Sequence, residues 1–114
     1  MHEFALAEDI IKTIGTSVNH KFGSISQINI EVGPFSGVVI DSLEFGLQII
    51  MKEKTNPTVK INIKQVSARA QCQCGKSYSF TTMFDGCPVC NSLQRKIISG
   101  MDIVINSVEI RENQ

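Results

Sequence analysis

The sequence contains no tryptophan, one tyrosine and only three prolines among its 114 residues. Aromatic residues make up 6% of the chain and apolar residues 42%, which suffices for a modest core but not for the walls of a large catalytic cleft. A chain of this length holds one domain, or one domain with a small satellite, and a core of that size gains stability from a structural metal.

Net charge is also missing, because 11 basic residues balance 11 acidic ones and give a pI of about 6.7. Such a chain is not built to coat nucleic acid or an anionic membrane. No apolar run approaches the ~20 residues of a membrane span, and the amino terminus lacks the basic and apolar regions of a signal peptide. We therefore expect a cytoplasmic protein whose four cysteines serve a metal site rather than disulfides.

Apolar periodicity predicts two helices. Spacings of three and four predict the first over residues 4–22, with Gly23 as its C-terminal stop. The second is predicted near residues 41–54, with Asp41 as its N-cap and Glu44 completing a capping box.

Alternating apolar residues predict three strands, over residues 25–33, from residue 59 onward, and from residue 101 onward. In the last two the alternation changes phase, at Val66 and at Val108, which predicts a bulge or a bend in each. If these two strands pair, the irregularities would face each other. The element order predicts an α+β fold, in which a small three-stranded sheet and two helices carry a cysteine module inserted before the last strand.

The stretch 69–97 differs in composition, because it holds all four cysteines and few long apolar residues. It lies between two predicted strands. We therefore predict that residues 1–68 and 98–114 form an α+β domain and that residues 69–97 form a small metal-held module.

The module contains two close cysteine pairs. One residue separates Cys72 from Cys74, and the second pair, Cys87 and Cys90, encloses Pro88 and Val89. Four thiolates from two such pairs suit the closed tetrahedron of a structural zinc ion, which leaves no coordination position for a catalytic water. Iron, as in rubredoxin-like electron carriers, accepts the same ligands, and four reduced cysteines without a metal are a further alternative.

Aromatic residues lie between the two cysteine pairs. We expect Tyr78, Phe80 and Phe84 to pack the small core of the module. The alternative is a zinc-ribbon interaction module that stacks these rings on single-stranded nucleic acid or binds transcription machinery. The neutral charge of the chain makes nucleic acid the less favoured partner.

The chain opens with Met1-His2-Glu3. A terminal amine, an imidazole and backbone amides in direct succession suit square-planar or tetragonal Ni(II) or Cu(II). Such a site binds by displacing protons, so its metal should exchange readily and its affinity should depend on pH. Taken alone, a solvated terminal histidine is the plainer interpretation.

Three further motifs accompany this terminus. They are Val32-Gly33-Pro34-Phe35-Ser36-Gly37, Ser42-Leu43-Glu44-Phe45, and the Cys-Pro-x-Cys motif before the final strand. Together with Met1-His2-Glu3 opening an amphipathic helix, they resemble the HypA/HybF family over essentially the whole chain. The resemblance implies a nickel metallochaperone for the maturation of nickel–iron hydrogenase. No catalytic triad, phosphate-binding glycine loop or carboxylate pair is apparent, so we do not expect an enzyme.

The resemblance also implies site residues and partners. It places nickel at His2, with the Met1 amine and the Glu3 backbone amide as further ligands. It implies that zinc is held by Cys72, Cys74, Cys87 and Cys90. The family usually has two residues between the first two cysteines, whereas this chain has one. The implied partners are the GTPase HypB and the hydrogenase large subunit as recipient, and in some organisms the family supplies urease.

Overall fold

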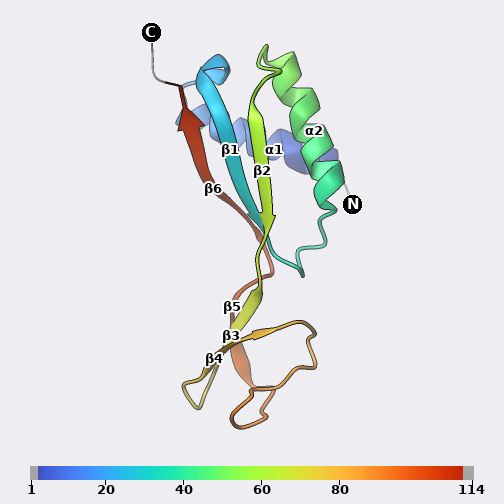
Figure 1. Cartoon of the computed structure of the whole chain (residues 1–114), viewed down its shortest axis with the longest axis vertical. Coiled ribbons are helices and arrows are strands. Elements are labelled where there is room, and N and C mark those ends of the chain that lie inside the picture. The colour runs from blue at the N-terminus through green and yellow to red at the C-terminus, as the bar shows by residue number, and fades with distance from the viewer. Residues whose placement is uncertain (1–2, 112–114) are drawn as a thin grey trace.

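The larger of two sheets has the strand order β2-β1-β6. The structure, a computed structural model, describes residues 3–111. The central strand β1 (Ile25–Val32) pairs in parallel with β2 (Lys60–Gln65) and antiparallel with β6 (Ile103–Ile110). Both outer strands of this sheet therefore lie next to β1, as Figure 1 shows.

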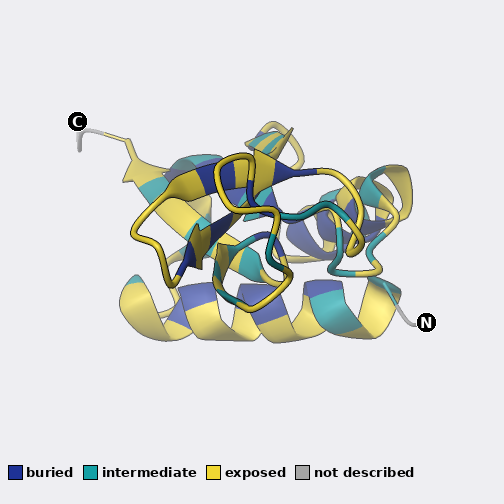
Figure 2. Cartoon of the chain, turned by 90° about the horizontal axis from the view of Figure 1, so that it is seen from below, coloured by how far each residue is buried: buried dark blue, intermediate teal, exposed yellow. Residues whose placement is uncertain are grey.

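Two helices, α1 (Glu3–Ser17) and α2 (Ile40–Glu53), pack with this sheet. Helix α1 crosses behind the strands, and α2 lies alongside β2 (Figure 1). The buried stripe of α1 faces the rest of the molecule and its exposed stripe faces outward (Figure 2). The buried residues of this core share apolar side chains and come from both helices and β1, with Val59 before β2: Ala7, Ile10, Ile11, Ile14, Ile25, Ile28, Ile30, Val32, Leu43, Leu47, Ile50, Met51 and Val59.

The first predicted helix is present but ends earlier than expected. Helix α1 stops at Ser17, so the prediction that Gly23 terminates it is wrong. Asn19 and His20 adopt left-handed φ angles of 54° and 60°. The His20 amide donates to the Gly15 carbonyl at 2.7 Å, a turn that satisfies a carbonyl in the last turn of α1.

The predicted cap of the second helix is also wrong. The N-cap of α2 is Val39, without a side-chain cap, and Asp41 lies within the first turn. The Glu3 carboxylate, from the start of α1, accepts a hydrogen bond from the Val39 amide at 3.1 Å. This contact joins the two helix starts and places a negative charge at the N-terminus of α2, where the helix dipole favours it.

The two strands with irregular alternation do not pair with each other, since both pair with β1. The phase change near Val66 marks the point where the chain leaves the larger sheet, because β2 ends at Gln65 and β3 (Ala68–Cys72) belongs to the second sheet. The change before Val108 is a bulge, in which Asn106 has no partner residue in β1.

The smaller sheet contains β3 at its centre, between β4 (Ser77–Phe80) and β5 (Arg95–Ser99). Both neighbours run antiparallel to β3. This sheet forms the lower part of an elongated molecule that measures 56 × 30 × 19 Å (Figure 1). The predicted α+β class, with a cysteine module ahead of the last strand, is confirmed. The second sheet was not predicted.

Backbone segments cross closely where the two sheets meet. A Cβ atom on Gly33 would lie 2.3 Å from the backbone of Gly100. One on Gly100, whose φ is +110°, would lie 2.6 Å from Ala68. Beyond this crossing, Phe35 stacks on Phe80 of the smaller sheet, with ring centroids 5.5 Å apart. The loop after β1 therefore reaches into the core of the cysteine module.

Candidate metal centre

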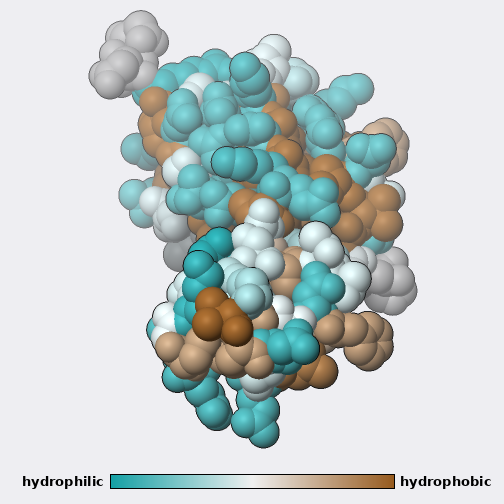
Figure 3. Space-filling model, turned by 60° about the horizontal axis from the view of Figure 1, so that its bottom comes forward, coloured by the Kyte–Doolittle hydropathy of each residue, from teal (hydrophilic) through white to brown (hydrophobic). Residues whose placement is uncertain are grey.

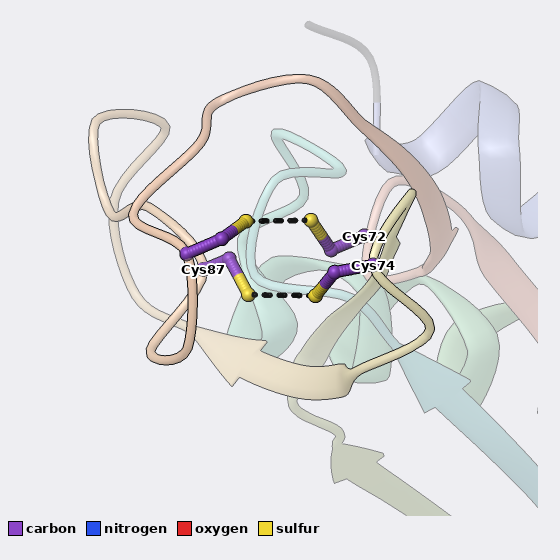
Figure 4. Close-up of side chains that lie close together, drawn as sticks. Cys72, Cys74 and Cys87 are labelled. Atoms are coloured by element: carbon purple, nitrogen blue, oxygen red, sulfur yellow. Dashed lines mark hydrogen bonds between the residues drawn. The ribbon is translucent and has the colours of Figure 1, made fainter.

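The four cysteines converge on one point. Their sulfur atoms all lie within 4.8 Å of one another. The Sγ atoms of Cys72 and Cys90 are 3.3 Å apart, and those of Cys74 and Cys87 are 3.7 Å apart (Figure 4). A tetrahedral ion with metal–sulfur bonds of about 2.3 Å places its ligands about 3.8 Å apart. The cluster therefore has the size of a single four-thiolate metal site.

The first cysteine pair is held by the turn between β3 and β4. The Cys72 amide donates to the Lys76 carbonyl at 2.8 Å, and the Gly75 amide donates to the Cys72 carbonyl at 2.9 Å. Gly75 has a φ of +95°, which a residue with a side chain rarely adopts. These bonds form a tight turn around Cys72 and Cys74. Cys74 therefore reaches the cluster although only one residue separates it from Cys72.

The second pair is held by a separate knuckle. The Asn91 amide donates to the Cys87 carbonyl at 2.7 Å, and the Cys87 amide donates to the Ser92 carbonyl at 3.0 Å. The Val89 amide points at the Cys87 sulfur, with N and Sγ 3.4 Å apart. An amide aimed at a sulfur stabilises the thiolate that a metal requires.

The sulfurs differ in acidity. Burial raises the pKa of Cys87, but the amides of Cys90 and Val89 and the sulfurs of Cys74 and Cys72 together outweigh burial and lower that pKa to about 6. The pKa of Cys72 is raised, because the favourable amide of Cys74 is outweighed by the Cys90 sulfur and by burial. Cys87 is therefore more ready than Cys72 to bind a cation at neutral pH, and binding at Cys72 releases a proton.

Arg95 braces the loop that connects β4 to the second knuckle. Its guanidinium donates to the carbonyls of Met83, at 2.8 Å, and of Asp85. It also lies over the Phe80 ring, 4.6 Å from the centroid, and reaches the Tyr78 hydroxyl at 3.4 Å. The sequence does not reveal this role, because an arginine in a cysteine module looks the same whether it binds a partner or its own backbone.

Asp85 stabilises the same loop through hydrogen bonds to other residues of the loop. Its carboxylate accepts hydrogen bonds from the amides and hydroxyls of Thr81 and Thr82. The Thr81 amide and then the Thr82 hydroxyl and amide lower the pKa of Asp85 to about 2. Asp85 was not predicted to matter, because its partners precede it in the chain, whereas in the familiar turn motif the aspartate precedes the amide that it binds.

The predicted aromatic core of the module is only partly correct. Tyr78 and Phe80 are buried, but Phe84 is 86% exposed, so the prediction that it packs inside is wrong. Asp85 and Arg95 fix the backbone around Phe84 without covering its ring. Hydrophobic residues consequently appear on the surface of the cysteine module (Figure 3).

The predicted nickel terminus is described only in part. Met1 and His2 lie outside the described residues, so their proposed role remains a prediction. Glu3 begins α1, and its carboxylate is bound to the Val39 amide. The predicted ligand at Glu3 is its backbone amide, a different group from the carboxylate that binds Val39.

Comparison with known proteins connects this architecture to a family. A family model described as hydrogenase/urease nickel incorporation, metallochaperone, HypA matches residues 1–110. The chain belongs to this family. It is 28% identical over 109 residues to the hydrogenase maturation factor HypA of Francisella philomiragia, covering 95% of this chain and 97% of the relative. With HypA of Pelodictyon phaeoclathratiforme it is 30% identical over 114 residues, covering 98% and 97%.

A solved structure supports the fold. The solution structure of the Ni metallochaperone HypA from Helicobacter pylori matches 99% of this chain and 100% of its own, with a TM-score of 0.69 at 15% identity. Membership of the HypA family links the chain to nickel incorporation for hydrogenase maturation, the role of a metallochaperone. Within residues 3–111, neither helix is long and apolar enough to cross a membrane.

Proposed function

We propose that this chain binds Ni(II) at its amino terminus and delivers it for the maturation of nickel–iron hydrogenase. The supporting observation is the family match over residues 1–110, which spans both Met1-His2-Glu3 and the cysteine module. The proposed ligands are the His2 imidazole, the Met1 amine and the Glu3 backbone amide, a set that suits Ni(II). Nickel is the transferred cargo.

The proposal assigns structural Zn(II) to Cys72, Cys74, Cys87 and Cys90. The sulfur spacing supports one tetrahedral ion, and zinc is the common occupant of closed four-thiolate sites. Structural zinc sites of this kind contribute about 10–16 kcal/mol of binding free energy to folding. Residues 69–97 would then be the zinc module, and residues 1–68 with 98–114 the nickel-binding domain.

Family membership supports the proposed partners. They are the GTPase HypB and the large subunit of the hydrogenase, which receives the ion, and the family description extends to urease. These steps take place in the cytoplasm. Handing over a cation from this terminus requires only ligand exchange, because the incoming protein supplies new donors while the old ones regain protons.

Replacement of His2 tests the nickel site. We expect His2→Ala to abolish stoichiometric Ni(II) binding in calorimetry, because the imidazole is the only side-chain ligand proposed. Metal analysis should find the same zinc content in both proteins. A Gly-Ser extension ahead of Met1 should also weaken binding, because it converts the chelating amine into an amide, whereas the same extension after Gln114 should not. Unchanged nickel affinity in His2→Ala would rule out this assignment.

A further inference from the structure

Two exposed phenylalanines flank a hollow near the start of both helices. Phe45 of α2 is 68% exposed and Phe4 of α1 is 45% exposed. Between α1 and α2 lies an open hollow of about 720 Å³ that both rings line. Apolar side chains gathered beside a hollow mark interaction sites, whereas single exposed ones are ordinary.

The floor of this hollow is firmly packed. A Cβ atom on Gly46 would lie 3.2 Å from the Ala7 side chain and 3.4 Å from the Phe4 ring. Gly46 and Ala7 are both buried, so the helices meet closely below the hollow. Phe4 rests against Gly46 and leaves part of its ring in solvent. A partner would therefore meet a preformed surface that loses little conformational entropy on binding.

The rim of the hollow is acidic. Glu3, Glu8 and Asp41 contribute to its lining, and among the described lining residues no side chain is basic. Glu8 and Asp41 are exposed, whereas the Glu3 carboxylate is bound to the Val39 amide. A rim of this kind favours a basic partner and repels an acidic one.

We propose that this hollow docks a protein segment that places an apolar side chain between Phe4 and Phe45 and a lysine or arginine against Glu8 and Asp41. The inference rests on the proposed function, because the hollow includes Glu3, the third residue of the proposed nickel-binding terminus. A receiving protein must approach that terminus to take the ion. Docking beside it makes ligand exchange effectively intramolecular.

The first test uses two labelled helical peptides and the zinc-loaded, nickel-free chain. One peptide carries leucine and lysine on the same face, and the other carries glutamate in place of each lysine. Fluorescence anisotropy should show that the lysine peptide binds at least about tenfold more tightly and that its affinity falls as salt is added. Equal affinity of the two peptides would overturn the proposal.

The second test uses surface variants. Phe45→Ser should weaken binding of the lysine peptide by about tenfold, since central aromatic anchors dominate such interfaces. Glu8→Lys should weaken it through charge. Phe84→Ser is the matched control, because Phe84 is 86% exposed but belongs to the cysteine module. An equal loss in Phe45→Ser and Phe84→Ser would overturn the proposal, and circular dichroism should show that each variant is folded.

Two further measurements separate this inference from others. Nickel titration should give the same affinity in Phe45→Ser as in the original chain, so a failure of nickel binding counts against the proposed function and not against docking. Sedimentation tests a second copy of this chain as the occupant. Self-association that Phe45→Ser abolishes would overturn the proposal of a basic partner.

Discussion

Gly100 lies where the backbones of the two sheets cross. Its φ of +110° is unfavourable for a residue with a side chain, and an added Cβ would lie 2.6 Å from Ala68. We expect Gly100→Ala to lower the free energy of unfolding by about 3 kcal/mol, because it combines backbone strain with a clash against main chain. Urea denaturation measures this difference.

Gly23→Ala is the control for Gly100→Ala. Nothing lies within 4 Å of a Cβ built there, and its φ is not positive. Gly23→Ala should therefore change the free energy of unfolding by no more than about 0.5 kcal/mol. If the two alanine variants were equally stable, the crossing at Gly100 would not be as tight as described.

Single residues were predictable where their partners are close in the sequence. The cysteine pairs were identified because Cys72 and Cys74, like Cys87 and Cys90, are local pairs whose chemistry needs only four sulfurs. The hydrogen bond between Glu3 and Val39 was not predicted, because its partners are 36 residues apart and meet only after α1 packs on α2. Glu3 therefore binds the amide of the residue that precedes the other helix, α2.

At the scale of elements, Asn56 fastens the end of α2 to the start of β1. This residue is 3% exposed, and its side-chain amide donates to the carbonyls of Phe22 at 2.9 Å and Ile25 at 2.8 Å. We expect Asn56→Ala to destabilise the chain by about 2 kcal/mol, because two carbonyls lose their donor in a site that water does not readily reach. Thermal unfolding followed by circular dichroism measures the effect.

Asn62→Ala is the appropriate comparison. The Asn62 side-chain amide also donates a hydrogen bond, but its acceptor is the side-chain oxygen of Asn29, at 3.3 Å, and the bond is exposed. Water replaces that bond, so the stability of this variant should stay within about 0.5 kcal/mol. A loss as large as that of Asn56→Ala would mean that burial does not account for the effect.

Elements were predicted better than their ends and their pairing. Periodicity identified both helices and the three strands of the larger sheet, because an element with one buried face has regularly spaced apolar residues. The end of α1 depends on left-handed angles at Asn19 and His20, which these residue types adopt more often than most but do not require. Strand pairing was left open by the sequence, and the two irregular strands are separated by β1, because packing rather than alternation decides which strands pair.

In the molecule as a whole, the larger sheet with its helices and the cysteine module have separate apolar clusters. The larger involves both helices and the larger sheet, and the smaller consists of six residues of the smaller sheet and the second cysteine knuckle, with Phe35 and Ile97 packed against it. Removal of the metal with a chelator should therefore unfold the module and leave the helices folded, because only the small cluster depends on the ion. Tyr78, the single tyrosine of the chain, lies in that cluster.

Tyrosine fluorescence consequently reports on the module alone, in a chain without tryptophan. We expect the chelator to change this fluorescence while the helical circular dichroism remains, and added zinc to restore the original signal. Loss of both signals together would show instead that the two bodies unfold as one cooperative unit. The sequence predicted a metal-held module but not its sheet, because β3 and β4 are short and the alternation of β3 follows directly on that of β2.

The loop between β1 and α2 contacts the cysteine module at one end and helix α1 at the other. Phe35 is stacked on Phe80 in the module, and the Val39 amide is bound to Glu3 at the start of α1. A segment held in this way opens when the less stable attachment gives way. The hydrogen-exchange rates of the amides of residues 36–38 should therefore report the free energy of breaking the weaker of the two attachments. These rates would measure how strongly the loop connects the module to the helices.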